Sequence, residues 1–170
     1  MKRGAGKIIA LSCGSIAAIL LAGVVQFAPI LVWNASASAP IGLYRIEYRA
    51  PEIGDYALIA PDGTLEKFIA GRGYLPENIP LLKRVAALPG DEICRKGEAI
   101  IINETYVAEA RIFDSSGRNL PQWSGCITLQ TDELFLLNDH ERSLDGRYFG
   151  STKADEVIGV AKPVWVRGAS

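Results

Sequence analysis

The sequence predicts a mainly β fold of antiparallel sheets, preceded by one N-terminal transmembrane helix. Two observations predict this architecture. The run 8–33 contains 26 residues without a charged side chain. After it come short alternating segments separated by proline and glycine, which is the pattern of strands joined by turns. The chain of 170 residues is long enough for one ordinary domain in addition to such a helix.

The uncharged run can cross a bilayer, because about 20 apolar residues suffice for a helical span. Three basic residues precede the run and none follows it closely. Basic residues favour the cytoplasmic side. The sequence therefore predicts a single-pass protein of the bacterial inner membrane, with 1–7 cytoplasmic, 8–33 the anchor and 34–170 a periplasmic domain.

A removable signal peptide is the alternative interpretation of the N-terminus. Ala35-Ser36-Ala37 fits the small-x-small pattern of a cleavage site. The apolar part of a signal peptide is typically about 7 to 15 residues, and this run is longer. Its length favours a retained anchor.

The composition argues against several classes of function. Lys and Arg number 18 against 19 Asp and Glu, a net charge of -1, whereas nucleic-acid binding usually shows a strong basic excess. With 49% hydrophobic and 22% charged residues, the chain is not of the disordered class. The sequence has one histidine, no CxxC pair and no glycine-rich nucleotide loop, so we expect no metal and no cofactor.

The part after residue 39 is expected to fold as short strands with one helix. The predicted strands are Gly42–Tyr48, Tyr56–Ala60, Leu81–Leu88, Ala99–Ile102, Leu134–Leu137 and Val157–Val166. The predicted helix is Thr64–Gly73, opened by Asp62 or Thr64 and closed by Gly71 or Gly73. Short strands at this spacing favour an antiparallel sandwich or a coiled barrel.

Two cysteines, Cys94 and Cys126, fall in the predicted periplasmic part, where disulfides form. They either form a bridge, worth about 3 to 4 kcal/mol in the chain-entropy model, or are two unrelated buried thiols. Cys13 lies in the uncharged run and is read as a small apolar residue.

Lys83 is the candidate general base for a serine nucleophile. The single histidine, His140, stands in a polar stretch that is typical of an exposed loop. A lysine can replace histidine if its amine is neutral, and desolvation favours the neutral amine. Strand alternation places Leu81, Val85 and Ala87 on the same face as Lys83. The alternative is an edge strand whose lysine reaches water.

Ser38 is the candidate nucleophile, five residues beyond Trp33 and directly outside the uncharged run. The hydroxyl of Ser36 could hold an oxyanion together with the backbone N–H of Ser38. Taken alone, this small-residue segment also fits a simple linker.

Three segments together resemble the type I signal peptidases, the S26 superfamily. Ser38-Ala39-Pro40 with Gly42-Leu43-Tyr44 looks like the nucleophile box of that family. Lys83–Asp91 (KRVAALPGD) closely resembles its lysine box, and Ser143–Gly150 (SLDGRYFG) its third box. The resemblance covers residues 34–162 and implies a signal-peptidase-like, coiled β fold.

Within that superfamily the chain is most similar to the TraF-type peptidases of conjugative transfer. This branch is favoured by the residue sequences of Arg72–Pro76 and Pro80–Lys83, by the compact size and by the single predicted anchor. Two departures are visible: Ala39 stands where methionine is frequent, and Gly146 where serine is frequent. Neither removes a reacting group.

The resemblance implies a role for each matching residue. Ser38 would be the acylated nucleophile and Lys83 its general base. Ser143 would orient the lysine amine, and Asp145 with Arg147 would form a supporting pair. Ser36 matches an oxyanion-hole position. A Ser/Lys dyad transfers the acyl group without a cofactor.

The implied substrates are precursor polypeptides that emerge from the inner membrane and carry small residues of the Ala-x-Ala kind before the cut. The resemblance suggests a pilin precursor. Water or an amine can resolve an acyl-enzyme, so hydrolysis and cyclisation both stay open.

The alternative of another class is a non-catalytic, membrane-tethered β domain that docks partners in an envelope secretion complex. The ordered set Ser38, Lys83 and Asp145 favours the enzyme, because an adaptor does not need these residues. The enzyme hypothesis predicts that Ser38 Oγ and Lys83 Nζ lie within hydrogen-bonding reach, or a little further apart without substrate.

Overall fold

The structure is a computed structural model of the chain, and it describes residues 12–16 and 30–167. Residues 12–16 are helical. No helix within these two ranges is long and apolar enough to cross a membrane. The predicted cytoplasmic start and most of the predicted span 8–33 lie outside the described residues, so the anchor stays a prediction.

The end of the expected membrane span is a strand. Leu31–Asn34 forms β1 and pairs with β2 (Gly42–Glu47), from Leu31 opposite Arg45 to Asn34 opposite Gly42. Val32 and Trp33 are residue types that favour strands. The Trp33 ring also stacks on Trp165, with 5.7 Å between the ring centroids. We had expected the helix to extend to Trp33. This expectation is wrong for Leu31–Trp33, which belong to a strand.

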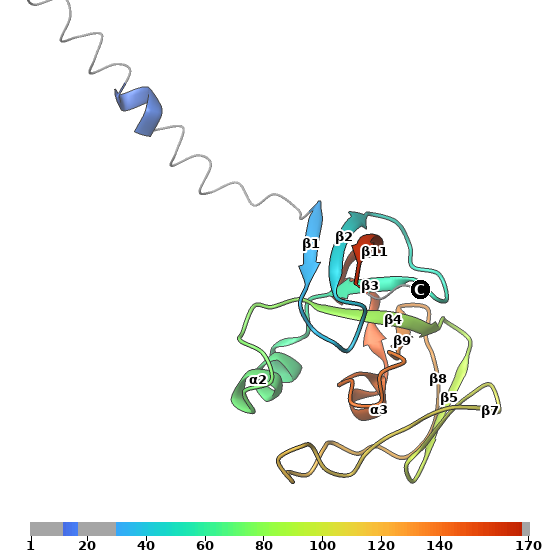
Figure 1. Ribbon diagram of the computed structural model, residues 1–170. Coiled ribbons are helices and arrows are strands. Elements are labelled where there is room, and N and C mark those ends of the chain that lie inside the picture. The colour runs from blue at the N-terminus through green and yellow to red at the C-terminus, as the bar shows by residue number, and fades with distance from the viewer. Residues whose placement is uncertain (1–11, 17–29, 168–170) are drawn as a thin grey trace, which may run out of the picture.

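The strands of the described chain form two antiparallel sheets (Figure 1). The larger has the order β1-β2-β11-β3-β4-β9-β10 and the smaller β7-β6-β5-β8. The larger sheet adds β3 (Tyr56–Ile59), β4 (Leu81–Ala87), β9 (Glu133–Leu136), β10 (Thr152–Lys153) and β11 (Val157–Val166). The smaller contains β5 (Glu92–Lys96), β6 (Ala99–Ile102), β7 (Thr105–Glu109) and β8 (Gly125–Thr128).

The mainly β, antiparallel prediction is confirmed, and each of the six predicted strands is present. The predicted helix is α2 (Gly63–Gly71), whose Leu65 N–H donates to the Asp62 carboxylate at 2.7 Å. Two short helices, α3 (Gly146–Phe149) and a 3-10 turn at Ala154–Glu156, were not predicted. Neither were β1, β5, β7, β8 and β10.

Strand β4 contributes to all three hydrophobic clusters of the core. Leu81 and Val85 belong to the cluster that packs against α2, and Leu82 to the cluster formed with β2 and β11. Ala87 belongs to the cluster formed with the smaller sheet. Packing on every side fixes β4, and with it Lys83, relative to the rest of the domain.

Strand β11 joins the N-terminal hairpin to the rest of the large sheet, because it lies between β2 and β3. The contact with β2 is close at Gly42. A Cβ atom on Gly42 would lie 2.1 Å from the backbone oxygen of Trp165. Only glycine allows this approach of the two strands.

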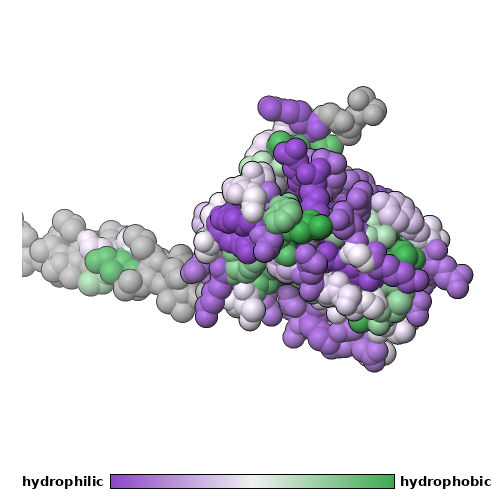
Figure 2. Space-filling view, turned by 90° about the horizontal axis from the view of Figure 1, so that it is seen from below, coloured by the Kyte–Doolittle hydropathy of each residue, from purple (hydrophilic) through white to green (hydrophobic). Residues whose placement is uncertain are grey.

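Apolar side chains are exposed at several places on the surface. On the face turned toward the viewer in Figure 2, hydrophilic residues predominate and apolar ones form small separate groups. One set lies on and beside β1 and β11: Ile30, Leu31, Trp33, Val164 and Trp165 are each at least 53% exposed. This set lies next to the end of the predicted anchor.

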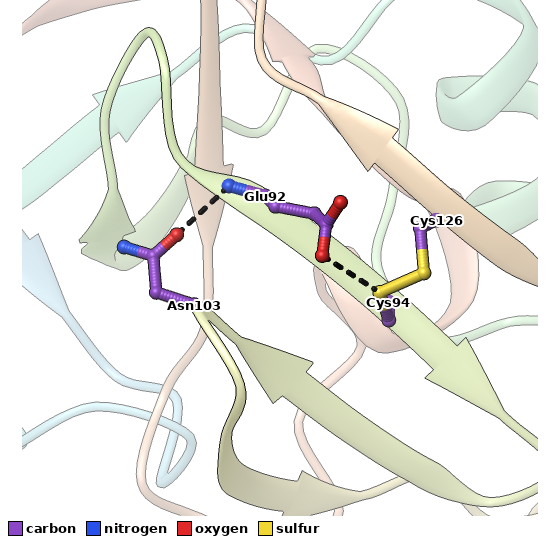
Figure 3. The surroundings of a disulfide bond; sticks show 4 residues. All are labelled: Glu92, Cys94, Asn103 and Cys126. Carbon is purple, nitrogen blue, oxygen red and sulfur yellow. Dashed lines mark hydrogen bonds between the residues drawn. A yellow bond between two sulfur atoms is a disulfide. The ribbon is translucent and has the colours of Figure 1, made fainter.

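A disulfide joins Cys94 on β5 to Cys126 on β8, which stand directly opposite each other (Figure 3). Of the two interpretations left open by the sequence, the structure contains the bridge. The Glu92 carboxylate oxygen lies 3.6 Å from the Cys94 sulfur.

Gly42→Ala is expected to lower the free energy of unfolding by about 3 kcal/mol or more, because the new methyl group collides with backbone rather than with a flexible side chain. Urea unfolding of the full chain in detergent measures the loss. Gly63→Ala is the matched control, since a Cβ there meets nothing within 4 Å. Equal midpoints for the two variants would contradict this account of Gly42.

Removing the disulfide with Cys94→Ser and Cys126→Ser together is expected to cost about 3 to 4 kcal/mol, since the bridge closes a loop with a sequence separation of 32 residues. Urea unfolding with and without dithiothreitol tests the value on the wild type. Cys13→Ser is the control, because Cys13 is a free cysteine and should not respond. A wild type indifferent to dithiothreitol would contradict the bridge.

Candidate active site

The predicted nucleophile lies in the loop 35–41 that connects β1 to β2. Ser38 is half-buried, and its Oγ is 3.0 Å from the Oγ of Ser36. The Ser38 backbone N–H donates to the same Ser36 oxygen at 3.3 Å. The two groups expected to form an oxyanion hole are thus adjacent, but they bind each other in this structure.

A buried amide stands at the base of this loop. Asn34 is 8% exposed and accepts a hydrogen bond from the Ser36 backbone N–H at 3.1 Å. It donates to three backbone carbonyl oxygens of the loop, those of Ser36, Ala39 and Pro40. The sequence analysis did not assign a function to Asn34.

The predicted base is buried in the middle of the large sheet. Lys83 lies on β4, between β3 and β9, and is 6% exposed. The alternative of an edge strand is therefore wrong. Lys83 Nζ donates to the Ser143 Oγ at 3.0 Å. Burial lowers the pKa of Lys83 to about 8, although the charge of Asp145 acts to raise it.

The predicted supporting pair is present and buried. Arg147 Nη1 donates to the Asp145 carboxylate at 2.7 Å, and both side chains are almost fully inaccessible. Asp145 caps α3 by accepting from the Arg147 backbone N–H at 3.2 Å. Burial raises the pKa of Asp145, and the guanidinium of Arg147 opposes this effect.

Asn138 connects the supporting pair to the strand of Lys83. Its side chain donates to the Leu82 carbonyl at 3.2 Å and accepts from the Arg84 N–H at 2.8 Å, the residues on either side of Lys83. Its backbone N–H donates to Asp145 at 3.1 Å. The sequence analysis missed this role; an asparagine directly after the apolar segment 134–137 was the available signal.

Ser36, Ser38 and Lys83 line one cleft of about 640 Å³. Its walls include apolar residues of α2, of the segment before β4 and of β4 itself, among them Ile69, Leu75, Ile79, Leu81 and Leu82. Within the described chain no hydrogen bond joins Ser38 to Lys83, because Ser38 is bonded to Ser36 and Lys83 to Ser143. The expectation was hydrogen-bonding reach or a slightly longer distance without substrate; the two residues border the same cleft without a hydrogen bond between them.

A second cleft, of about 520 Å³, borders Ser38 on another side. Ser38 and His140 both line it. His140 is exposed, and its Nδ1 accepts from the Arg142 backbone N–H at 3.1 Å. This placement agrees with the interpretation of His140 as an exposed loop residue.

Glu92, Cys94 and Cys126 are the group of metal-ligating residue types that the described residues bring together. The two sulfur atoms are bonded to each other. Neither sulfur is therefore available as a thiolate ligand.

The comparisons with known proteins agree with one another. The family described as "Signal peptidase, peptidase S26" matches residues 4–166. The plasmid transfer protein TraF of Escherichia coli is 35% identical, over 93% of this chain and 94% of that protein. The conjugal transfer protein TraF of Agrobacterium fabrum is 31% identical, over 78% of this chain and 80% of that protein.

A solved signal peptidase I from Enterococcus faecalis is 22% identical and superposes with a TM-score of 0.40, over 67% of this chain and 98% of that one. The assignment rests on the sequence matches, which extend over nearly the whole chain. The chain belongs to the signal peptidase family, peptidase S26.

Proposed function

We propose that this chain is a membrane-anchored serine endopeptidase that cuts precursor polypeptides, with a pilin precursor of conjugative transfer as its substrate. The observation that carries the proposal is a buried lysine without a carboxylate ion partner in the described chain, opening onto the cleft that also contains Ser38. A buried amine is costly when charged, and its neutral form is a base.

The first chemical step forms an acyl-enzyme. The neutral Lys83 Nζ removes the proton from Ser38 Oγ, and the oxygen attacks the carbonyl carbon before the cut. Because Lys83 donates a hydrogen to Ser143, its lone pair points elsewhere, where it can receive the Ser38 proton. The resulting ammonium gives that proton to the leaving amine as the peptide bond breaks.

The second step releases the product. Water attacking the ester gives hydrolysis, and an amine of the substrate gives a new peptide bond. In either case Lys83 takes a proton from the attacking group and returns it to Ser38 Oγ. The Asp145–Arg147 pair and Asn138 hold the lysine strand during both steps.

The Ser38 N–H and the Ser36 hydroxyl are the proposed donors to the oxyanion of the tetrahedral intermediate. They are occupied by each other before substrate binds. A substrate carbonyl oxygen must replace the Ser36 oxygen as the acceptor of the Ser38 N–H. The hydroxyl of Ser36 then becomes a second donor.

The proposed location is the periplasmic surface of the inner membrane, with the N-terminus in the cytoplasm. Ser38 lies four residues after the end of β1. The exposed apolar side chains of β1 precede it closely in the chain, and those of β11 belong to the same sheet as β1. The disulfide supports an oxidising compartment. The names of the TraF relatives, which refer to plasmid and conjugal transfer, support the pilin substrate.

Ser38→Ala and Lys83→Ala are each expected to reduce cleavage at least about 10⁴-fold, because each removes one half of the dyad. The test is coexpression with candidate pilin precursors, followed by intact-mass measurement, in which cleaved and cyclised products differ by one water. Lys153→Ala, which changes a lysine 50% exposed at its side chain, is the control and should cleave normally. Processing retained by a folded Ser38→Ala variant would contradict the proposal.

The acidic limb of the pH–rate profile is expected to have its midpoint near pH 8, since the base must be deprotonated and its pKa is about 8. Activity should rise with pH through this range. Asp145→Asn should move the midpoint to lower pH, because the Asp145 charge raises the pKa of Lys83. Asp132→Asn at an exposed position should not move it. A midpoint unchanged by Asp145→Asn would indicate another base.

A further inference from the structure

We propose that Asn34 is a positioning residue. Its side chain binds the backbone of the loop 35–41 and thereby fixes the position of the proposed nucleophile, Ser38. The inference rests on the proposed function of Ser38. Asn34 is the last residue of β1, and it stands opposite Gly42, the first residue of β2. The pair closes the hairpin from which Ser38 projects.

The amide of Asn34 is fully engaged with the loop backbone. Its Oδ1 accepts from the Ser36 N–H at 3.1 Å. Its Nδ2 donates to three backbone carbonyl oxygens, that of Ser36 at 2.9 Å, that of Ala39 at 3.1 Å and that of Pro40 at 3.0 Å. Two hydrogens on Nδ2 thus serve three carbonyl groups, which come from both sides of Ser38.

These contacts determine which backbone groups point inward. The carbonyl groups of Ser36, Ala39 and Pro40 converge on Asn34 and are satisfied there. Ser38 is not bonded to Asn34; its side chain and N–H contact the Ser36 hydroxyl, and the residue borders both clefts. Without the amide, the Ser36 and Ala39 carbonyl groups and the Ser36 N–H would lose this partner, and the Pro40 carbonyl would keep only the Tyr44 hydroxyl.

The chemistry of the site selects asparagine. The Ser36 N–H needs an acceptor, and the carbonyl oxygens need a donor, so a side chain with both is required. Aspartate has the same shape but would place a charged carboxylate against the carbonyl oxygens. Alanine would leave the centre of the loop empty.

The position of Asn34 is itself rigid. The side chain is 8% exposed, and the strand pair Asn34–Gly42 continues into the β2–β11 contact, where Gly42 lies against the backbone of Trp165. The Tyr44 hydroxyl adds a second support for the loop by donating to the Pro40 oxygen at 2.7 Å. The loop that carries the nucleophile is therefore held to the large sheet by the Asn34 amide and, at Pro40, by the Tyr44 hydroxyl.

The test measures cleavage of an internally quenched peptide containing Ala-Gln-Ala by the full chain in detergent. Asn34→Asp and Asn34→Ala are expected to lower kcat about 100-fold with KM changed less than about threefold, since misplacing a reacting group by about 1 Å has this effect. In Asn34→Ala the acidic limb should keep its wild-type midpoint, because Lys83 is untouched and no charge is added to the cleft. Tyr44→Phe removes only the hydrogen bond to the Pro40 oxygen. It should lower kcat less than the Asn34 variants do, and KM should again change little.

A control separates positioning from general loss of stability. Ile100→Ala removes a fully buried side chain in the smaller sheet and should lower the thermal midpoint without lowering kcat at 25 °C. If Ile100→Ala lowers kcat to the same extent as the Asn34 variants, the effect belongs to stability and the inference is overturned. Asn34 variants with full kcat, beside an inactive Ser38→Ala, would overturn it while leaving the proposed function intact. Cleavage by Ser38→Ala would overturn the proposed function instead.

Discussion

The burial of one amine, that of Lys83, is the constraint on which the arrangement of the site depends. A charged ammonium at this depth would be costly, and the pKa of about 8 reflects that cost. Burial and the positive charge of Arg147 favour the neutral form, the Ser143 hydroxyl accepts a hydrogen bond from the amine, and the Asp145 carboxylate is engaged with Arg147. Asn138 then fixes the strand on both sides of the lysine. The polar groups around Lys83 therefore form one connected network rather than independent contacts.

The two halves of the proposed dyad come from different parts of the large sheet. Lys83 lies on a central strand packed against all three hydrophobic clusters, whereas Ser38 projects from a hairpin near the edge. The position of the base is thus fixed by apolar packing, and that of the nucleophile by hydrogen bonds to Asn34.

The parts of the site that follow from local pattern could be predicted from the sequence. Alternation predicted that Lys83 is buried, which the structure confirms, and the three family-like segments indicated Ser38, Ser143, Asp145 and Arg147 as candidate site residues. Asn138 could not be found in this way, because it bonds residues 54 and 56 positions away in the chain, which only folding brings together. The partners of Asn34 are near in the chain, but they are backbone groups, and the residue types of the loop do not indicate which of them turn toward its amide. Strand β1 was not predicted, because a short apolar segment at the end of an apolar run is compatible with either a helix or a strand. Strands β7 and β8 of the smaller sheet are mostly exposed and lack a clear alternation of buried and exposed residues.

The place of β11 in the sheet determines when a newly made chain can become active. The hairpin with Ser38 leaves the ribosome early, but the only strand that joins it to β3 and β4 is the last one described, Val157–Val166. Until that strand has been synthesised, nucleophile and base belong to separate pieces of sheet. A chain that has not yet reached β11 carries the small-residue sequence Ala35-Ser36-Ala37 next to its own uncharged run but lacks the assembled candidate site. In this topology the proposed nucleophile and base are brought together only after the β11 segment has been made.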